Sequence, residues 1–315
     1  MTAYILSDSE PTARALVRDY VALLKPRVMT LVVFTFVVGY VAAPGAVDAF
    51  TLILSTLCVT AGAGAAAALN MAYDADIDAI MRRTKTRPIP AGRVSRESAT
   101  AFGVTLSLMA VAVMGLSVNW LAAGILAFSI FFYAVIYTMW LKRSTPQNIV
   151  IGGAAGAFPP MIGWVAGTGE ISVNAVLLFL LIFFWTPPHF WALALYKTGD
   201  YAKAGIPMLP NVAGAKATRL QIWLYSLVLV GISLLPVKTG LGGPIYAVGA
   251  SLLGLGFMGL AWRVWRSQAG EATNENAASL YEVTKGNRAA RNLFAYSILY
   301  LFAIFGVLLF ERLGG

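Results

Sequence analysis

Three oxygen-bearing side chains recur every four residues in one segment of the chain: Asn70, Asp74 and Asp78. On a continuing helix this spacing drifts by about 40° per step, so the three side chains extend along one face for roughly 12 Å. Such acids repel one another unless a cation lies among them. Oxygen ligands suit Mg²⁺, which proteins hold by one or two carboxylates while phosphates and water complete its shell. A cation pathway in a transporter and a solvated helix end are the alternative interpretations.

A cluster of cations follows this acidic stripe. The run Arg-Arg-Thr-Lys-Thr-Arg-Pro-Ile-Pro-Ala-Gly-Arg occupies residues 82–93 and includes Arg83 and Arg87. Guanidinium groups match phosphate oxygens bidentately, and a metal held by carboxylates bridges the same oxygens. Because both groups adjoin an apolar segment, they predict a site for an isoprenoid diphosphate.

A second unusual segment, FWTPPHFWALALYKTGDYAKAGIPMLP, spans residues 184–210. Its chemically distinctive members are His189, which is the only histidine in the chain, Trp191, Lys197 and Asp200. We expect the adjacent Pro187 and Pro188 to break or kink their helix, so that irregular backbone lines a cavity beside His189. A hydrogen-bonded core histidine is the alternative interpretation.

Two more cations, Lys142 and Arg143, lie between apolar segments. They either bind an anionic ligand or only set the topology of the chain, and the sequence leaves both possibilities open. The following segment carries Gly152 and Gly156, which we interpret as a small-residue face for helix packing.

The elements that position these residues are membrane helices. Of the 315 residues, 59% are hydrophobic and only 12% are charged, whereas soluble domains are nearer half and a quarter. Apolar runs predict nine spans, at 28–47, 50–70, 98–117, 119–140, 147–167, 172–193, 220–237, 244–262 and 292–310. The prediction is therefore an all-α integral membrane protein, with a cytoplasmic segment over residues 1–21 and one membrane domain over 22–315.

The charges fix an orientation for these spans. If the N-terminus is cytoplasmic, all 23 Lys and Arg residues except Lys238 and Arg312 fall on the cytoplasmic side, as expected for short loops. The long charged loops then face the cytoplasm, and the C-terminus lies on the opposite side. Because no soluble part carries a basic face, we expect the lipid bilayer rather than nucleic acid as the partner of the net +9 charge. A bacterial cytoplasmic (inner) membrane is the simplest location.

The motifs resemble those of a known family. The spacing Asn-x3-Asp-x3-Asp at 70–78 resembles the UbiA-type intramembrane prenyltransferases, which include ubiquinone-pathway enzymes. Within them, Trp-Thr-Pro-Pro-His-Phe-Trp at 185–191 and Pro-Met-Leu-Pro at 207–210 resemble the branch that farnesylates protoheme IX. This resemblance runs from about residue 22 to 310.

The resemblance implies a fold, a reaction and a set of roles. The fold is about nine helices around a central apolar cavity, and the reaction converts farnesyl diphosphate, heme b and water into heme O and diphosphate. Mg²⁺ would bind Asp74 and Asp78, and heme b would be a substrate rather than a permanent cofactor. The implied catalytic residues are Asn70, Asp74, Asp78, His189 and Asp200; those for the diphosphate are Arg83, Arg87, Lys142, Arg143 and Lys197; those for heme are Lys25, Arg27, His189 and Trp191.

Some roles and functions stay open. His189 is either an axial ligand of heme iron or a base for the entering water. Quinone-type members carry Asp-x-x-Asp where this chain has Lys197 and Asp200, which argues against a second metal bound as in those members. Heme A synthase and terminal-oxidase assembly proteins are candidate partners. The alternative functions are a quinone-precursor or chlorin prenyltransferase, a secondary transporter, and a catalytically silent heme-binding scaffold.

Overall fold

The computed structural model describes residues 17–197, 202, 204–271 and 285–314, and helices joined by turns and loops make up this part of the chain. The helices are α1 (Val17–Leu23), α2 (Pro26–Ala42), α3 (Ala49–Tyr73), α4 (Ala75–Ile80), α5 (Arg96–Ser117), α6 (Trp120–Phe131), the π-helix η1 (Phe132–Leu141), α7 (Asn148–Thr168), α8 (Val173–Tyr196), α10 (Leu209–Lys238), α11 (Pro244–Arg266), the short 3₁₀ helix η2 (Lys285–Asn287) and α12 (Arg288–Gly314). The predicted all-α membrane fold is confirmed.

The predicted number of spans agrees with these helices. Within the described part, eight helices are long and apolar enough to cross a membrane, and a ninth span results if α1 and α2, bent by 54°, count as one. The predicted first span, 28–47, was wrong at its end because α2 stops at Ala42. The next residue, Ala43, precedes Pro44 and takes an extended ψ of 150°, the conformation that a following proline imposes.

The prediction for Pro187 and Pro188 was a break or a kink; the break was wrong, and the kink stays a prediction. Helix α8 continues from Val173 to Tyr196 through both prolines. It packs against α7, α10 and α12, and both prolines are buried. Packing of this kind lets a membrane helix continue past a proline, because the neighbouring helices replace the support of the missing backbone hydrogen bonds.

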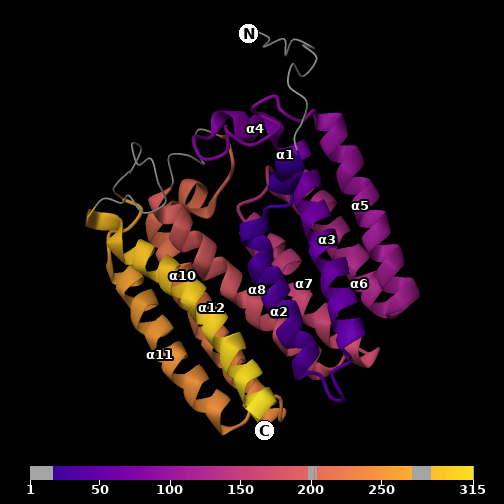
Figure 1. Cartoon of the computed structure of the whole chain (residues 1–315). Coiled ribbons are helices and arrows are strands. Elements are labelled where there is room, and N and C mark those ends of the chain that lie inside the picture. Colours follow the sequence, from indigo (N-terminus) through magenta and orange to yellow (C-terminus); the bar gives the residue numbers. More distant parts are fainter. Residues whose placement is uncertain (1–16, 198–201, 203, 272–284, 315) are drawn as a thin grey trace.

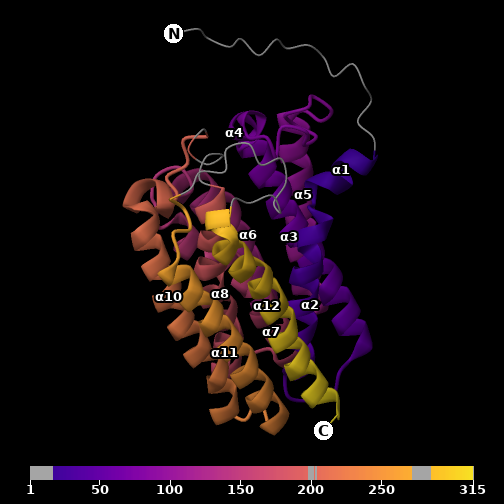
Figure 2. The same cartoon turned by 90° about the vertical axis from the view of Figure 1, so that its left-hand side faces the viewer.

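The helices form two groups that lie side by side (Figures 1 and 2). On one side α2, α3, α5, α6 and α7 pack together, and on the other α8, α10, α11 and α12 do so. Contacts between α7 and α8 and between α2 and α12 join the groups. Helices α1 and α4 lie at one end of the bundle, and the C-terminus lies at the other (Figures 1 and 2). The polar stripe at the end of α3 is therefore placed at the end that carries α1 and α4.

Glycines let α2 and α7 approach backbone to backbone. A Cβ atom at Gly163 of α7 would lie 2.2 Å from the carbonyl oxygen of Phe36, and one at Gly39 of α2 would lie 2.1 Å from that of Pro160. The predicted packing face at Gly152 is also real, since a Cβ there would strike the Tyr137 ring at 2.2 Å. Gly156 is different: it has open space around it and lines the central cavity, so the packing interpretation was wrong for this residue.

We expect Gly163→Ala to destabilise the protein strongly, because the new methyl group meets backbone that cannot move aside. Overpacking of a close-packed interior costs about 1–3 kcal/mol. The matched control is Gly156→Ala on the same helix, where the methyl group enters open space. Thermal unfolding in one detergent should show a clearly lower Tm for Gly163→Ala alone; equal Tm values for the two variants would contradict the close approach.

Candidate active site

The acidic stripe is buried where α3 passes into α4. Asp74 joins the two helices with φ −84° and ψ 8°, so the helix does not continue unbroken as predicted. The four-residue hydrogen bonding is nevertheless kept, since the amide of Asp74 donates to Asn70 and that of Asp78 donates to Asp74, both at 2.9 Å. Asn70, Asp74 and Asp78 are 4%, 1% and 3% exposed. The alternative interpretation of these residues as a solvated helix end is therefore excluded.

Cations from distant segments compensate the buried acids. Lys142 forms an ion pair with Oδ2 of Asp74, and Arg87 lies 2.6 Å from Oδ2 of Asp78. Arg143 binds the exposed Asp76 bidentately, at 2.7 and 2.8 Å, and lies 3.5 Å from Asp74. Hydrogen bonds from Arg143 hold the pKa of Asp76 below its usual value. The structure thus brings Arg87, Lys142 and Arg143 together at the stripe, as expected for anion-binding groups.

Lys25 reaches the stripe from the turn between α1 and α2. Its Nζ donates to Oδ1 of Asn70 at 2.8 Å, and it lies 5.9 Å from the centre of the Tyr133 ring. Lys25 has φ 51°, and within the described part of the chain it is the one residue other than glycine with a positive φ. A left-handed conformation is unfavourable for such a side chain, so its presence beside a polar cluster indicates a functional constraint.

The π-helix η1 supplies a partner that the sequence did not reveal. The side-chain amide of Asn70 donates through Nδ2 to Oγ1 of Thr138 at 3.1 Å and to Oδ2 of Asp74 at 2.7 Å. Thr138 in turn donates to the carbonyl of Tyr133, five residues earlier, at 2.7 Å. Long π-helical stretches are rare and concentrate at functional sites. No sequence pattern announces one, which is why Thr138 was missed.

Other predicted residues have different surroundings. Arg83 is exposed and makes no hydrogen bond or ion pair with the described residues. Arg27 is exposed and lines the central cavity. Lys197 follows the last residue of α8 and is half-buried. Asp200 lies outside the described residues.

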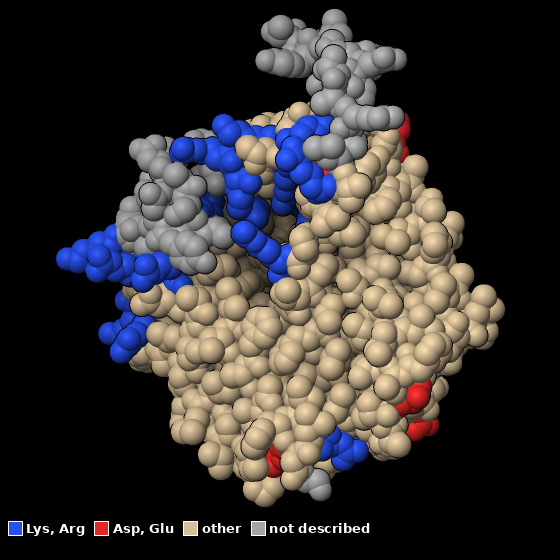
Figure 3. All heavy atoms as spheres, in the orientation of Figure 1, with Lys and Arg blue, Asp and Glu red and all other residues tan. Residues whose placement is uncertain are grey.

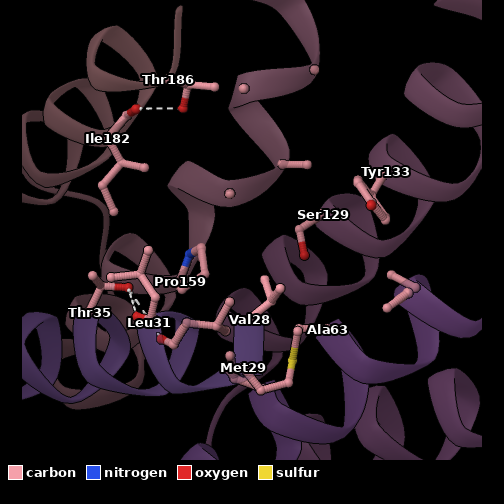
Figure 4. Close-up of a pocket in the computed structure, with 18 of the residues that line it drawn as sticks. Val28, Met29, Leu31, Thr35, Ala63, Ser129, Tyr133, Pro159, Ile182 and Thr186 are labelled. Atoms are coloured by element: carbon pink, nitrogen blue, oxygen red, sulfur yellow. Dashed lines mark hydrogen bonds between the residues drawn. The ribbon is translucent and has the colours of Figure 1, made fainter. Parts of the chain in front are cut away.

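A cavity of about 520 Å³ lies between the two groups of helices. Residues of α2, α3, α6, η1, α7, α8 and α12 line it, and most of them are apolar. Figure 4 shows Val28 of α2, Ser129 of α6, Tyr133 of η1 and Pro159 of α7 around this space. Tyr133 is also the neighbour of Lys25, so the cavity and the acidic stripe adjoin. The predicted central apolar cavity is present.

His189 lines this cavity, whereas Trp191 does not. Nδ1 of His189 lies 2.6 Å from Oγ of Ser297 on α12, and its ring stacks on those of Trp185 and Phe294. Trp191 is buried on another face of α8, where its ring meets Tyr225 of α10 edge to face. The two residues predicted to contact the same ligand are therefore not brought together.

Lys and Arg side chains gather around a hollow in the molecular surface, near the end that carries α1 and α4 (Figure 3). The same view is almost free of charge along the middle of the bundle, as a surface in contact with lipid must be. A hollow lined by positive charge attracts anions.

Asp74 and Asp78 also fit a divalent cation. Oδ1 of Asp74 is buried and has no hydrogen-bond partner, so a carboxylate oxygen is available. No group of three or more His, Cys, Asp or Glu side chains that could hold a metal occurs among the described residues. A cation held by two carboxylates and completed by phosphate oxygens and water, as Mg²⁺ commonly is, needs no third protein ligand.

The chain is similar to known prenyltransferases along most of its length. The model of the UbiA prenyltransferase family matches residues 31–283. A structure from work on digeranylgeranylglyceryl phosphate synthase in membranes has a TM-score of 0.77 at 17% identity, covering 95% of this chain and 99% of that one. A UbiA homolog from Archaeoglobus fulgidus bound to GPP and Mg²⁺ has a TM-score of 0.59 at 15% identity, covering 92% and 99%. The chain therefore belongs to the UbiA prenyltransferase family.

Within this family, the chain matches relatives named protoheme IX farnesyltransferase at high identity. The relative from Maricaulis maris is 62% identical over 311 residues, which cover 98% of this chain and 94% of the relative. That from Caulobacter vibrioides is 59% identical and covers 98% and 95%. The predicted resemblance is confirmed, and it extends over nearly the full length of both chains.

Proposed function

We propose that this protein transfers the farnesyl group of farnesyl diphosphate to a vinyl group of heme b, with addition of water, and releases diphosphate. The observation that carries this proposal is the 62% identity to a protoheme IX farnesyltransferase over nearly the whole chain. The site supports it, because a buried cluster of cations and carboxylates adjoins an apolar cavity. Such a site suits a substrate with one polyanionic end and one apolar end.

Asp74 and Asp78 are the residues that would hold Mg²⁺. The metal, when bound, neutralises negative charge that develops on the departing diphosphate. The ion pairs of Lys142 with Asp74 and of Arg87 with Asp78 hold both cations beside the same position. Phosphate oxygens arriving there gain charge-assisted hydrogen bonds from groups that are already in place. We assign Lys25 to this diphosphate cluster, because it bonds Asn70, and not to the heme side.

The cavity residues would control the reacting carbon atoms. The bond between farnesyl C1 and the diphosphate oxygen breaks, and the diphosphate keeps the electron pair. The terminal vinyl carbon of heme bonds to C1, and water adds to the other vinyl carbon and loses a proton. Aromatic and aliphatic walls, among them Tyr133 and Phe190, exclude the bulk water that would otherwise quench the allylic cation. Arg27, the charged residue among those that line the described cavity, would bind a heme propionate.

Mass spectrometry of the extracted heme tests this function. Purified protein incubated with heme b, farnesyl diphosphate and Mg²⁺ should yield a product heavier by one farnesyl group plus one water. Excess EDTA should abolish the product, and added Mg²⁺ should restore it. Farnesylation of a quinone precursor instead of heme would favour the quinone-type alternative; absence of any transfer and of any diphosphate release, with heme still bound, would favour a scaffold.

We also propose the orientation. The charged end with α1 and α4 faces the cytoplasm of a bacterium, and the C-terminus faces the opposite side of the inner membrane. The separation of these ends in the fold and the distribution of Lys and Arg support this assignment. Cysteine accessibility to a membrane-impermeant reagent, with single cysteines at Arg83 and at Lys238 in a Cys58→Ala background, should report opposite sides.

A further inference from the structure

The surroundings of His189 favour one of its two ring nitrogens as the site of the proton. The Ser297 hydroxyl lies 2.6 Å from Nδ1 of His189 and donates its hydrogen to the carbonyl oxygen of Phe294 at 2.7 Å. A hydroxyl has a single hydrogen, so a Ser297 that donates to Phe294 can only accept the hydrogen bond from His189. A neutral imidazole then carries its hydrogen on Nδ1 and an unshared electron pair on Nε2. Within the described part of the chain, Nε2 has no hydrogen-bond partner.

Stacking on two neighbouring rings fixes the orientation of the His189 ring. The imidazole stacks on the rings of Trp185 and Phe294, with distances of 4.2 and 4.7 Å between ring centroids and interplanar angles of 19° and 24°. Trp185 is itself held by Ser297, whose backbone carbonyl accepts the indole N–H at 2.7 Å. Ser297 is fully buried on α12, so one residue anchors two aromatic side chains of α8 beside the cavity.

We propose that Ser297 is a positioning residue, which keeps His189 as the Nδ1–H tautomer so that Nε2 binds the iron of the heme substrate. This inference rests on the proposed function. Metal-binding histidines commonly donate their other ring N–H to an oxygen acceptor, which fixes the tautomer and raises the basicity of the ligating nitrogen. The bond between Nδ1 and Ser297 has this form.

The same surroundings disfavour the role of base. A base that takes a proton on Nε2 becomes an imidazolium ion, and in the Ser-His-Asp triad a carboxylate on the other ring nitrogen stabilises that ion. Here the partner of Nδ1 is the uncharged hydroxyl of Ser297, and the rings that stack on the imidazole are the uncharged aromatic rings of Trp185 and Phe294. Burial of a new charge in these surroundings is unfavourable. A neutral ligand requires no such charge.

The single histidine makes a direct test possible. Full-length protein purified without a histidine tag and labelled with ¹⁵N-histidine gives signals from His189 alone. ¹⁵N NMR of the heme-free protein should show Nδ1 protonated and Nε2 unprotonated. A protonated Nε2 in the wild-type protein would overturn the proposal. With ferric heme b bound and no farnesyl diphosphate, pulsed EPR should show a ¹⁵N coupling to the iron; bound heme without this coupling would also overturn it and leave the base role.

Variants then isolate the contribution of Ser297. We expect Ser297→Ala to mix the two tautomers in the ¹⁵N spectrum and to weaken heme binding by roughly 10-fold or more. The matched control is Ser226→Ala on α10, since Ser226 is also fully buried and donates to a helix carbonyl but does not contact His189. A wild-type tautomer ratio and heme affinity in Ser297→Ala would contradict the proposal. Failure of the proposed function is distinguishable from failure of the Ser297 proposal. In that case the wild-type protein would form no farnesylated heme, whatever the His189 spectra show.

Discussion

Replacement of Asp74 by asparagine is expected to lower kcat by roughly 100- to 1,000-fold, the loss typical when a group that stabilises transition-state charge is removed. Asp74 is the most buried acid of the stripe, and it pairs with Lys142 through Oδ2, while its Oδ1 accepts no hydrogen bond and lies 3.5 Å from Arg143. Asparagine keeps the size of the side chain but removes the charge that attracts both Lys142 and a metal. Steady-state release of diphosphate at saturating Mg²⁺ measures the effect.

The control for this variant lies at the other end of the same helix. Asp48 caps the N-terminus of α3, where Oδ2 accepts the amide hydrogen of Thr51 at 2.7 Å. Because asparagine is as good a helix cap as aspartate, Asp48→Asn should keep its activity and its Tm. An intermediate result is expected for Asp76→Asn, since the exposed Asp76 positions Arg143 without facing the buried cluster. Activity of Asp74→Asn within about 10-fold of the wild type would refute the metal site.

Arg87→Met is expected to lower kcat by about 100-fold or more, whereas Arg83→Met should change it only slightly. The two arginines belong to one basic loop, and the sequence gives them the same role. In the structure Arg87 is half-buried and paired with Asp78 at 2.6 Å, but Arg83 is exposed. Arg87→Met therefore removes both the counter-charge of a buried carboxylate and a donor for the leaving diphosphate.

Comparison of the two arginine variants separates local chemistry from general attraction of anions. Both variants remove one positive charge from the same loop, so a field effect on substrate capture should be similar in the two and should weaken in high salt. The kcat difference at saturating farnesyl diphosphate reports the specific contact of Arg87. Equal kcat values for the two variants would show that the pair between Arg87 and Asp78 has no catalytic role.

The sequence by itself determined the class of fold and the composition of the site. Runs of about 20 apolar residues must be helical in a bilayer, because backbone groups have no water to bond there, so the spans could be located from hydropathy alone. The spacing of Asn70, Asp74 and Asp78 also indicated one shared face, since the four-residue period of a helix is a local property. The Lys and Arg residues of the loops also predicted one cation-rich end, because the charge of each loop is likewise a local property of the sequence.

Tertiary structure decided which residues of complementary chemistry come into contact. Lys25, Lys142 and Arg143 are far from the stripe in sequence, and only the packing of α2, α3 and η1 brings them to it. Arg83 and Arg87 have the same chemistry, yet the turn after α4 buries only one of them. Ser297 lies 108 residues from His189, and no local pattern connects the two. These contacts depend on how helices pack, which is set by side-chain shape over the whole bundle and not by the period of any one segment.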